Sequence, residues 1–317
     1  MAELCYGCFE KKNNPGPCLK CGYDAATHKG KFPYALKPGT VLNGQYLIGR
    51  VVDIDTTGII YAAREVQSGQ RLEIKEFMNT DLARRETSGQ IVPLDGRQEL
   101  FEESRAEFIK EAKTVAGFGR MENIIHVQDV FEANGTACFA MEHVDGCCLT
   151  EYVRIMGGRL TEASAKRILL PIMDALDKLH GSGLIHANIS PYSIIVGADG
   201  ISRLTAFGDA VRRMGEKLPC YGNLLISPFA AVEIYSMRSG KGPFSDVYSM
   251  AATFYYAVTG IKPPNAIDRL MSDELIMPAA LDVKLSLSAR QTLLKGLELR
   301  AGKRCQTMAE LAETLRN

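Results

Sequence analysis

Two pairs of cysteines near the N-terminus constrain the first part of the chain more than any other feature. Each pair has the form CxxC, and nine residues separate Cys5 and Cys8 from Cys18 and Cys21. A CxxC turn directs two thiolates at one ion, and two such turns complete a tetrahedral four-thiolate site of the structural zinc type. We therefore predict that these four cysteines bind zinc. The alternatives are unrelated thiols, two disulfides or a redox-active pair.

The segment that carries these cysteines is short. About 25 residues cannot bury a sufficient hydrophobic core, so metal binding would contribute most of the folding free energy of residues 1–25. Gly22 permits a tight turn directly after Cys21. Residues 26–44 contain two prolines and show little apolar periodicity, which predicts a linker.

The composition is typical of a globular protein. The 317 residues are 46% hydrophobic and 23% charged, which excludes a largely disordered chain and allows two domains or lobes. Lys plus Arg equal Asp plus Glu at 37 each, so no overall field attracts nucleic acid or an acidic membrane surface. No apolar run approaches the roughly 18–20 residues of a membrane helix, and no leader pattern is visible. We expect a cytoplasmic protein without nucleic-acid or membrane partners.

The local patterns change from strand to helix along the chain. Residues 45–52, 58–66 and 71–77 are β-rich, and Asn134-Gly135 joins residues 124–131 to 136–144 as a hairpin, which together predict a five-stranded antiparallel sheet. Between the third and fourth strands, residues 99–118 have helical spacing. After the last strand, helical spacing continues in residues 162–180, 246–259, 288–299 and 308–315, with Thr161 as the expected N-cap of the first of these. This order is typical of an α+β fold.

The second part of the chain carries a series of short motifs. In order, they are Leu72-Glu73-Ile74-Lys75, Glu111, Leu184-Ile185-His186-Ala187-Asn188, Ala206-Phe207-Gly208, Ala231-Val232-Glu233 and Ser245-Asp246-Val247-Tyr248. These motifs and their order resemble those of a bacterial Ser/Thr protein kinase. The resemblance implies a bilobal protein-kinase-like fold over residues 45–317, with an N-lobe at 45–143 and a C-lobe at 147–317. With the leading cysteines, the chain is similar to bacterial kinases that carry an N-terminal zinc ribbon.

Three positions depart from this family pattern. Ala206 stands in place of the metal-binding Asp of Asp-Phe-Gly, and an alanine methyl group cannot ligate a hard cation. Asn188 replaces the catalytic base, and a carboxamide does not accept a proton at neutral pH. Ser193 replaces the Asn that the family places on the second magnesium ion. The departures predict a pseudokinase, which is no enzyme and has no catalytic residue, and ATP and magnesium are not expected to bind conventionally.

The glycine-rich loop is altered as well. Gly58 is retained, whereas Asp53 and Asp55 stand where the resemblance places the other two glycines. A carboxylate about 5 Å from a phosphate charge repels it by roughly 3 kcal/mol at an effective dielectric of 20. The two aspartates therefore oppose triphosphate binding, unless the hairpin bends away and they are solvated turn residues.

Other positions keep the family's residue. Lys75 and Glu111 match an ion pair that either orients a nucleotide's phosphates or ties a helix to the sheet. Met141 matches a residue at the back of an adenine pocket, which side chains fill in the alternative interpretation. With Gly58, these residues would form a vestigial nucleotide cleft.

The resemblance also implies an intact C-lobe. Asp246 would brace the backbone of the catalytic loop, and Glu233 would pair with Arg304. The leading hypothesis is a protein-binding scaffold or allosteric regulator, whose partner is an active kinase or another signalling protein. One alternative is a nucleotide-dependent transferase or weak Ser/Thr kinase that uses a displaced metal site built from Lys75, Asp209 and the two hairpin aspartates. Another alternative is a metal-independent nucleotide sensor.

Overall fold

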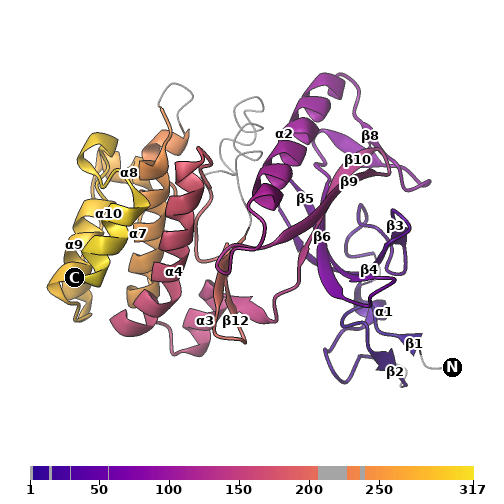
Figure 1. The fold of residues 1–317 in the computed structure, drawn as a ribbon, viewed down its shortest axis with the longest axis horizontal. Helices are drawn as coiled ribbons and strands as arrows, with labels where there is room; N and C mark the ends of the chain where they lie inside the picture. The colour runs from indigo at the N-terminus through magenta and orange to yellow at the C-terminus, as the bar shows by residue number, and fades with distance from the viewer. Residues whose placement is uncertain (1–2, 14–15, 29, 56, 206–226, 236–239) are drawn as a thin grey trace. The chain divides into compact units, whose positions relative to one another are not determined.

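The computed structural model of the chain describes residues 3–13, 16–28, 30–55, 57–205, 227–235 and 240–317. The chain divides into two compact units (Figure 1). The N-terminal unit comprises residues 1–119 and 126–143, and the C-terminal unit comprises residues 120–125 and 144–317. The first unit is built around an antiparallel sheet and the second unit is mainly helical, in agreement with the predicted α+β order.

One antiparallel sheet organises the N-terminal unit. Its strand order is β3-β4-β5-β6-β10-β9. The strands are β3 (Val41–Leu42), β4 (Tyr46–Ile54), β5 (Gly58–Glu65), β6 (Arg71–Phe77), β9 (Val127–Ala133) and β10 (Thr136–Glu142). Helix α2 (Gln98–Gly117) lies against this sheet, and its Phe101 and Phe108 rings each pack 5.5 Å from the ring of Phe77 on β6. Aromatic packing of this kind anchors the helix beyond the area that it buries.

The sheet has one strand more than predicted. Strand β3 falls inside the segment that the sequence predicts as a linker, and Val41 and Leu42 pair with Leu47 and Tyr46. The turn between the strands has positive φ at Asn43 (50°) and Gly44 (65°). This Asn-Gly turn is the same hairpin signal that predicts the turn at Asn134-Gly135.

The remaining elements of the N-terminal unit are short. Strands β1 (Glu3–Leu4) and β2 (Lys11–Lys12) pair antiparallel, and α1 (Ala25–His28) follows them. An additional hairpin, β7 (Ala83–Arg85) and β8 (Ile91–Pro93), lies between β6 and α2 and was not predicted. Arg85 of this hairpin forms a buried ion pair with Glu76 of β6. The pair ties the hairpin to β6, and removing one partner would be costly because it would leave the other charge buried and unpaired.

Helix α7 forms the centre of the C-terminal unit. Every residue from Ser245 to Thr259 of α7 is buried, and α4, α9 and α10 contact it. Thr161 caps α4 as predicted, since its hydroxyl accepts the Ser164 N–H. The helices are α3 (Leu149–Ile155), α4 (Glu162–Gly181), α7 (Pro243–Thr259), α8 (Ala266–Met271), α9 (Leu287–Gly296) and α10 (Met308–Arg316).

A small sheet and three short 3-10 helices complete the described part of this unit. The sheet order is β11 (Gly146–Cys148), β12 (Ile194–Gly197) and β13 (Ser202–Leu204). The 3-10 helices are η1 (Val232–Tyr235), η2 (Pro278–Leu281) and η3 (Ala301–Lys303). Among the described residues, no helix combines the length and the apolar character that crossing a membrane requires.

Candidate functional site

The four N-terminal cysteines converge on one point. Their Sγ atoms all lie within 4.8 Å of one another, with Cys5 and Cys21 separated by 3.7 Å and Cys8 and Cys18 by 3.8 Å. A tetrahedral ion with Zn–S bonds of about 2.3 Å places its sulfur ligands about 3.8 Å apart. These distances are too long for disulfides, and the thiols are free. The donor set and its spacing therefore fit a tetrahedral, thiophilic metal such as zinc.

The two cysteine turns have the same backbone design. The Phe9 N–H donates to the Cys5 carbonyl, and the Gly22 N–H donates to the Cys18 carbonyl. Both donors adopt a left-handed conformation, with φ of 58° at Phe9 and 71° at Gly22. The role predicted for Gly22 is confirmed, whereas Phe9 adopts this conformation without the freedom of glycine.

Lys75 is a buried cation at the centre of the N-terminal sheet. It lies on β6 between β5 and β10 and is 5% exposed. Its Nζ atom forms an ion pair with Oδ2 of Asp55 at 2.6 Å. Asp55 lies in the turn between β4 and β5, at a position where the resemblance to kinases places a glycine of the glycine-rich loop. The sequence did not predict this pair, because the prediction assigned Lys75 to Glu111.

Backbone and hydroxyl donors hold the Asp55 carboxylate. Oδ1 accepts the Thr57 N–H (2.8 Å), the Thr57 hydroxyl (2.6 Å) and the Gly58 N–H (3.0 Å). Burial acts to raise the pKa of Asp55, but the Lys75 ammonium and the Thr57 donors outweigh it and hold this pKa below its usual range. Asp55 is therefore an ionised, oriented carboxylate directly beside the lysine.

Two neighbouring hairpin residues differ from Asp55. Asp53 is exposed, and its carboxylate accepts the Ile54 N–H next to it at 2.8 Å. Gly58 lies tightly against β6, where a Cβ atom would approach the Glu76 carbonyl oxygen to 1.9 Å. The need for glycine at this position is therefore structural, whatever its role toward a phosphate.

Asp246 of α7 organises the loop that follows α4. The buried carboxylate accepts the N–H groups of His186 and Ala187, both at 2.8 Å, and lies 2.8 Å from Nε2 of His180. Ala187 has a φ of 60°, which for alanine persists only where the surroundings fix it. The predicted bracing role of Asp246 is confirmed. The contact with His180 was missed, because no local motif connects residues so far apart in the sequence.

His186 is neutral inside this loop. Its Nε2 lies 3.0 Å from the Thr205 carbonyl oxygen, and its Nδ1 accepts the Asn188 N–H at 3.2 Å. One nitrogen thus donates and the other accepts, as in an uncharged imidazole. Burial lowers the pKa of His186 to about 4, although the Asp246 carboxylate opposes this shift.

The loop positions that replace family residues differ in exposure. Asn188 is exposed. Ser193 is 2% exposed, and its hydroxyl accepts the Ser190 N–H (2.9 Å) and donates to the Ser190 carbonyl (3.0 Å). The Ser193 hydroxyl therefore forms its hydrogen bonds with the backbone of its own loop.

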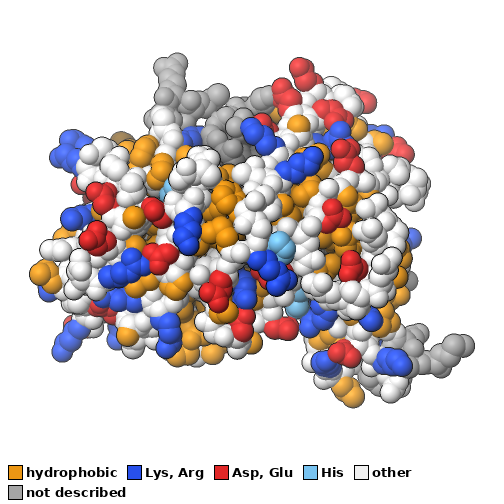
Figure 2. Space-filling view, viewed as in Figure 1, with side chains coloured by type: hydrophobic (Ala, Val, Ile, Leu, Met, Phe, Trp, Pro, Cys, Tyr) orange, Lys and Arg blue, Asp and Glu red, His pale blue; other side chains and the backbone are white. Residues whose placement is uncertain are grey.

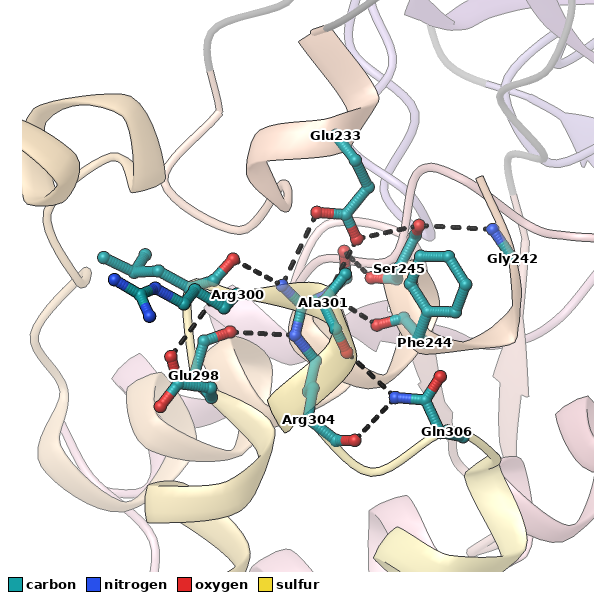
Figure 3. A network of polar contacts seen from close by, with 11 residues as sticks. Glu233, Gly242, Phe244, Ser245, Glu298, Arg300, Ala301, Arg304 and Gln306 are labelled. Carbon is teal, nitrogen blue, oxygen red and sulfur yellow. Dashed lines mark hydrogen bonds and ion pairs between the residues drawn. The ribbon is translucent and has the colours of Figure 1, made fainter. Parts of the chain in front are cut away.

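A buried ion pair links two segments of the C-terminal unit that are 71 residues apart in the sequence. Arg304 and Glu233 have side chains 0% and 6% exposed, with Nη1 of Arg304 2.7 Å from Oε1 of Glu233 (Figure 3). Arg304 also donates to the carbonyls of Phe244, Glu298 and Leu299. This confirms the pairing that the resemblance implies.

The structure gives the positions of Glu111 and Met141 but does not test their predicted contacts. Glu111 lies on α2, and Met141 is a buried residue of β10 opposite Glu73. The pairing of Lys75 with Glu111 and the contact of Met141 with an adenine stay predictions. Ala206 and Asp209 lie outside the described residues.

Charged side chains of both signs are interspersed on the face that Figure 2 draws. This distribution agrees with the formal net charge of zero. Extended single-sign patches, which steer polyanions toward a protein, do not dominate this face.

Comparison with solved structures gives the same fold. The chain matches a structure described as the apo form of PpkA-294 with a TM-score of 0.78 and 27% identity, covering 89% of this chain and 99% of that one. The kinase domain of Mycobacterium tuberculosis PknI matches with a TM-score of 0.66 and 19% identity, covering 89% and 98% of the two chains. The second likeness concerns the fold alone.

Curated relatives match a smaller part of their own length. A probable serine/threonine-protein kinase of Clostridium perfringens (CPE1738) is 26% identical over 220 residues, or 66% of this chain and 31% of that protein. CBL-interacting protein kinase 16 of Oryza sativa subsp. japonica is 26% identical over 224 residues, or 69% and 44% of the two chains. The chain thus spans less than half the length of these relatives.

These findings correct one prediction made from the altered motifs. The expectation that the chain is not an enzyme is wrong, because the relatives are named as protein kinases and a family model described as Protein kinase domain matches residues 56–311. The matched segment includes Lys75, the catalytic-loop region around Asn188 and the Glu233–Arg304 pair. The chain belongs to the protein kinase family.

Proposed function

We propose that the chain is a Ser/Thr protein kinase that binds a nucleoside triphosphate at Lys75 and uses Asp55 as the ligand of a displaced magnesium site. The observation that carries this proposal is the ion pair between the buried Lys75 and the ionised Asp55. Phosphoryl transfer depends mainly on positioning and on stabilising charge with cations. The buried Lys75 ammonium supplies one cation for the phosphates, and the oriented Asp55 carboxylate supplies a ligand for a second one, magnesium.

When nucleotide binds, Lys75 would contact the phosphates and Asp55 would bind magnesium. Phosphate oxygens would accept hydrogen bonds from Nζ of Lys75, in place of the Asp55 carboxylate. Protein sites for magnesium commonly supply one or two carboxylates, and the phosphates and water complete the octahedron. Magnesium, when bound, would neutralise charge on the transferring phosphoryl group. Asp55 is an appropriate ligand because it is ionised and held by the Thr57 donors.

The catalytic loop would orient the acceptor hydroxyl. Asp246 fixes the loop backbone on both sides of Ala187, and the exposed Asn188 amide can accept a hydrogen bond from a serine or threonine hydroxyl. The amide cannot take the proton of the acceptor hydroxyl. This proton would instead pass to a phosphoryl oxygen or to water, late in the transfer. Because a positioned base contributes about 10²–10⁴-fold, we expect kcat below the typical range of about 1–100 s⁻¹.

The protein partner would then be a substrate that carries serine or threonine, and the names of the relatives support this class. The test uses the purified chain, ATP labelled at the γ-phosphate, magnesium and a degenerate library of serine- and threonine-containing peptides. Slow transfer is expected in the wild type. It should fall by at least about 100-fold in Lys75→Met and stay unchanged in Lys37→Met, which alters an exposed lysine of the same unit. Absence of transfer from the wild type would refute the proposal.

A second candidate function, a metal-independent nucleotide sensor, is favoured by the same turn. Release of Asp55 from Lys75 would free the hairpin, which changes the N-terminal surface without chemistry. In this case ATP would raise the melting temperature equally with magnesium and with a chelator. Stabilisation by about 2.7 kcal/mol is expected at 100 times the Kd.

We also propose that the cysteine cluster holds one structural zinc ion. Four thiolates at tetrahedral spacing support this, and a reducing compartment such as the cytoplasm keeps them available. Elemental analysis should find one equivalent of zinc in the wild type and none in the Cys5→Ser/Cys18→Ser double variant. Zinc that persists in the double variant would contradict this site.

A further inference from the structure

We propose that metal binding at the cysteine cluster controls the Asp55–Lys75 ion pair, through a direct contact between the cluster and strand β4. The cluster is therefore a regulatory input to the N-terminal sheet and not a separate appendage. The effect of the metal on nucleotide affinity rests on the proposed function, whereas its effect on the hairpin that carries Asp55 is independent of that function.

The first step is the contact between the first cysteine turn and β4. The carbonyl of Tyr6, between the two cysteines of the turn, accepts the N–H of Arg50 at 2.8 Å. The ring of Phe9 lies against Gly49, where an added Cβ atom would approach Phe9 Cζ to 2.7 Å and the Tyr6 carbonyl oxygen to 2.3 Å. Glycine is therefore needed at this position for the turn to approach the strand.

The second step is the irregular pairing of β4 at the same place. The register between β4 and β5 shifts between Ile48 and Val51 and again between Val51 and Asp53. Ile48 bonds to residues 39 and 40 on the outer edge of β4, and backbone groups further along this edge need another partner. The cysteine turn supplies that partner for Arg50 inside the irregular stretch, so it supports the bulged register of β4.

The third step leads from the bulge to the ion pair. Asp55 follows β4 directly, and in the observed register its carboxylate lies 2.6 Å from Nζ of Lys75. A shift of one residue in a strand turns each side chain to the opposite face. Loss of the bulge would therefore move Asp55 away from Lys75 and loosen the turn in which the Thr57 and Gly58 amides donate to the Asp55 carboxylate.

The fourth step is the dependence of the turn on the metal. Phe9 has a φ of 58°, an unfavourable conformation for a residue with a side chain. A segment this small has little core of its own, so metal ligation by Cys5 and Cys8 would hold the turn in shape. Without the metal, the turn would relax, and the contacts of Tyr6 and Phe9 with β4 would be lost.

The test is hydrogen exchange mass spectrometry on the full chain, without nucleotide. The probes are the amides of Arg50, Thr57 and Gly58, which donate to Tyr6 or Asp55. We expect exchange about tenfold faster in the Cys5→Ser/Cys18→Ser variant than in the zinc-loaded wild type, because local opening becomes more favourable. Peptides from α7 serve as the internal reference and should be unchanged.

A second variant separates the contact from the metal. Phe9→Gly removes the ring that lies against Gly49, keeps all four thiols and suits the left-handed conformation. It should retain one equivalent of zinc and still exchange faster at Thr57 and Gly58. The matched control is Gly117→Ala, since no atom lies within 4 Å of an added Cβ there; it should behave as the wild type.

Two results would overturn the proposal. One is wild-type exchange at Thr57 and Gly58 in both the zinc-free variant and Phe9→Gly. The other is an equal increase in the α7 peptides, which would indicate general unfolding. Binding of a fluorescent ATP analogue is measured in parallel without magnesium. We expect the affinity to rise by about tenfold in the same two variants, because Asp55 no longer competes with the phosphates for Lys75. If no form binds the analogue, the proposed function fails, but the exchange data still decide the inference.

Discussion

Lys75 in the N-terminal unit and Arg304 in the C-terminal unit are both buried cations that pair with a carboxylate, yet their surroundings differ. The Arg304 and Glu233 side chains are 0% and 6% exposed, and three backbone carbonyls accept the other Arg304 donors. The Lys75 side chain is 6% exposed, but its partner Asp55 is 31% exposed and lies in a hairpin turn. The first pair is enclosed, whereas the second can exchange its partner.

This difference distinguishes an ion pair whose loss mainly affects stability from an ion pair that can open to bind a ligand. An enclosed pair contributes little net free energy but is costly to break, because the remaining charge stays buried. A pair with an accessible carboxylate can open when a competing anion arrives, at a smaller cost. We therefore expect substitutions at Arg304 to act on stability and substitutions at Asp55 to act on nucleotide binding.

The largest effect is expected for the enclosed pair. Arg304→Ala should lower the free energy of unfolding by about 3–5 kcal/mol, because Glu233 loses its partner while buried. The control is Arg316→Ala, which breaks an ion pair with Asp174 whose side chains are 45% and 51% exposed. It should cost less than about 1 kcal/mol in urea denaturation. Equal losses in the two variants would remove the basis of the comparison.

The buried His186 gives a pH-dependent effect of intermediate size. Burial lowers its pKa to about 4 in the folded chain, against about 6.5 when unfolded, so the unfolded state binds more protons between these values. The contribution is present above pH 6.5 and is lost as the pH falls to about 4, which amounts to about 3 kcal/mol.

Urea denaturation of the wild type and His186→Phe at a series of pH values measures this term. The difference in unfolding free energy between the two chains should shrink as the pH falls from about 6.5 to about 4. A difference that stays constant over this range would mean that His186 does not titrate there.

The smallest effect is expected at the accessible pair. Without magnesium, Asp55→Asn should bind ATP about tenfold more tightly than the wild type, because the carboxylate no longer competes with the phosphates for Lys75. Isothermal titration measures this affinity. Asp81→Asn, at an exposed aspartate of the same unit, should leave it unchanged. Weaker or equal binding by Asp55→Asn would show that the carboxylate does not occupy the phosphate position.

Local patterns in the sequence predicted the elements that short-range interactions determine. The CxxC pairs predicted the four-thiol cluster, Thr161 predicted the start of α4, and Asn134-Gly135 predicted the hairpin between β9 and β10. In each case the residues that interact lie close in the sequence or follow a fixed spacing. Strand β3 was missed although Asn43-Gly44 carries the same turn signal.

The unpredicted part of the site depends on contacts between distant residues. Asp55 and Lys75 lie 20 residues apart and meet at a turn that follows a bulged strand, and the sequence near Asp55 does not specify that register. His180 reaches Asp246 only because α4 packs on α7. Family resemblance supplied the Glu233–Arg304 pair, but it also led to the incorrect expectation that altered motifs exclude enzymatic activity.

Single-turnover transfer of labelled γ-phosphate, with magnesium varied, tests the central claim most directly. We predict that the wild type transfers phosphate to serine or threonine with saturable dependence on magnesium. Asp55→Asn should lose that dependence and at least about 100-fold in rate, while still binding ATP. Transfer by Asp55→Asn at the wild-type rate and with the same dependence on magnesium would contradict the proposed site.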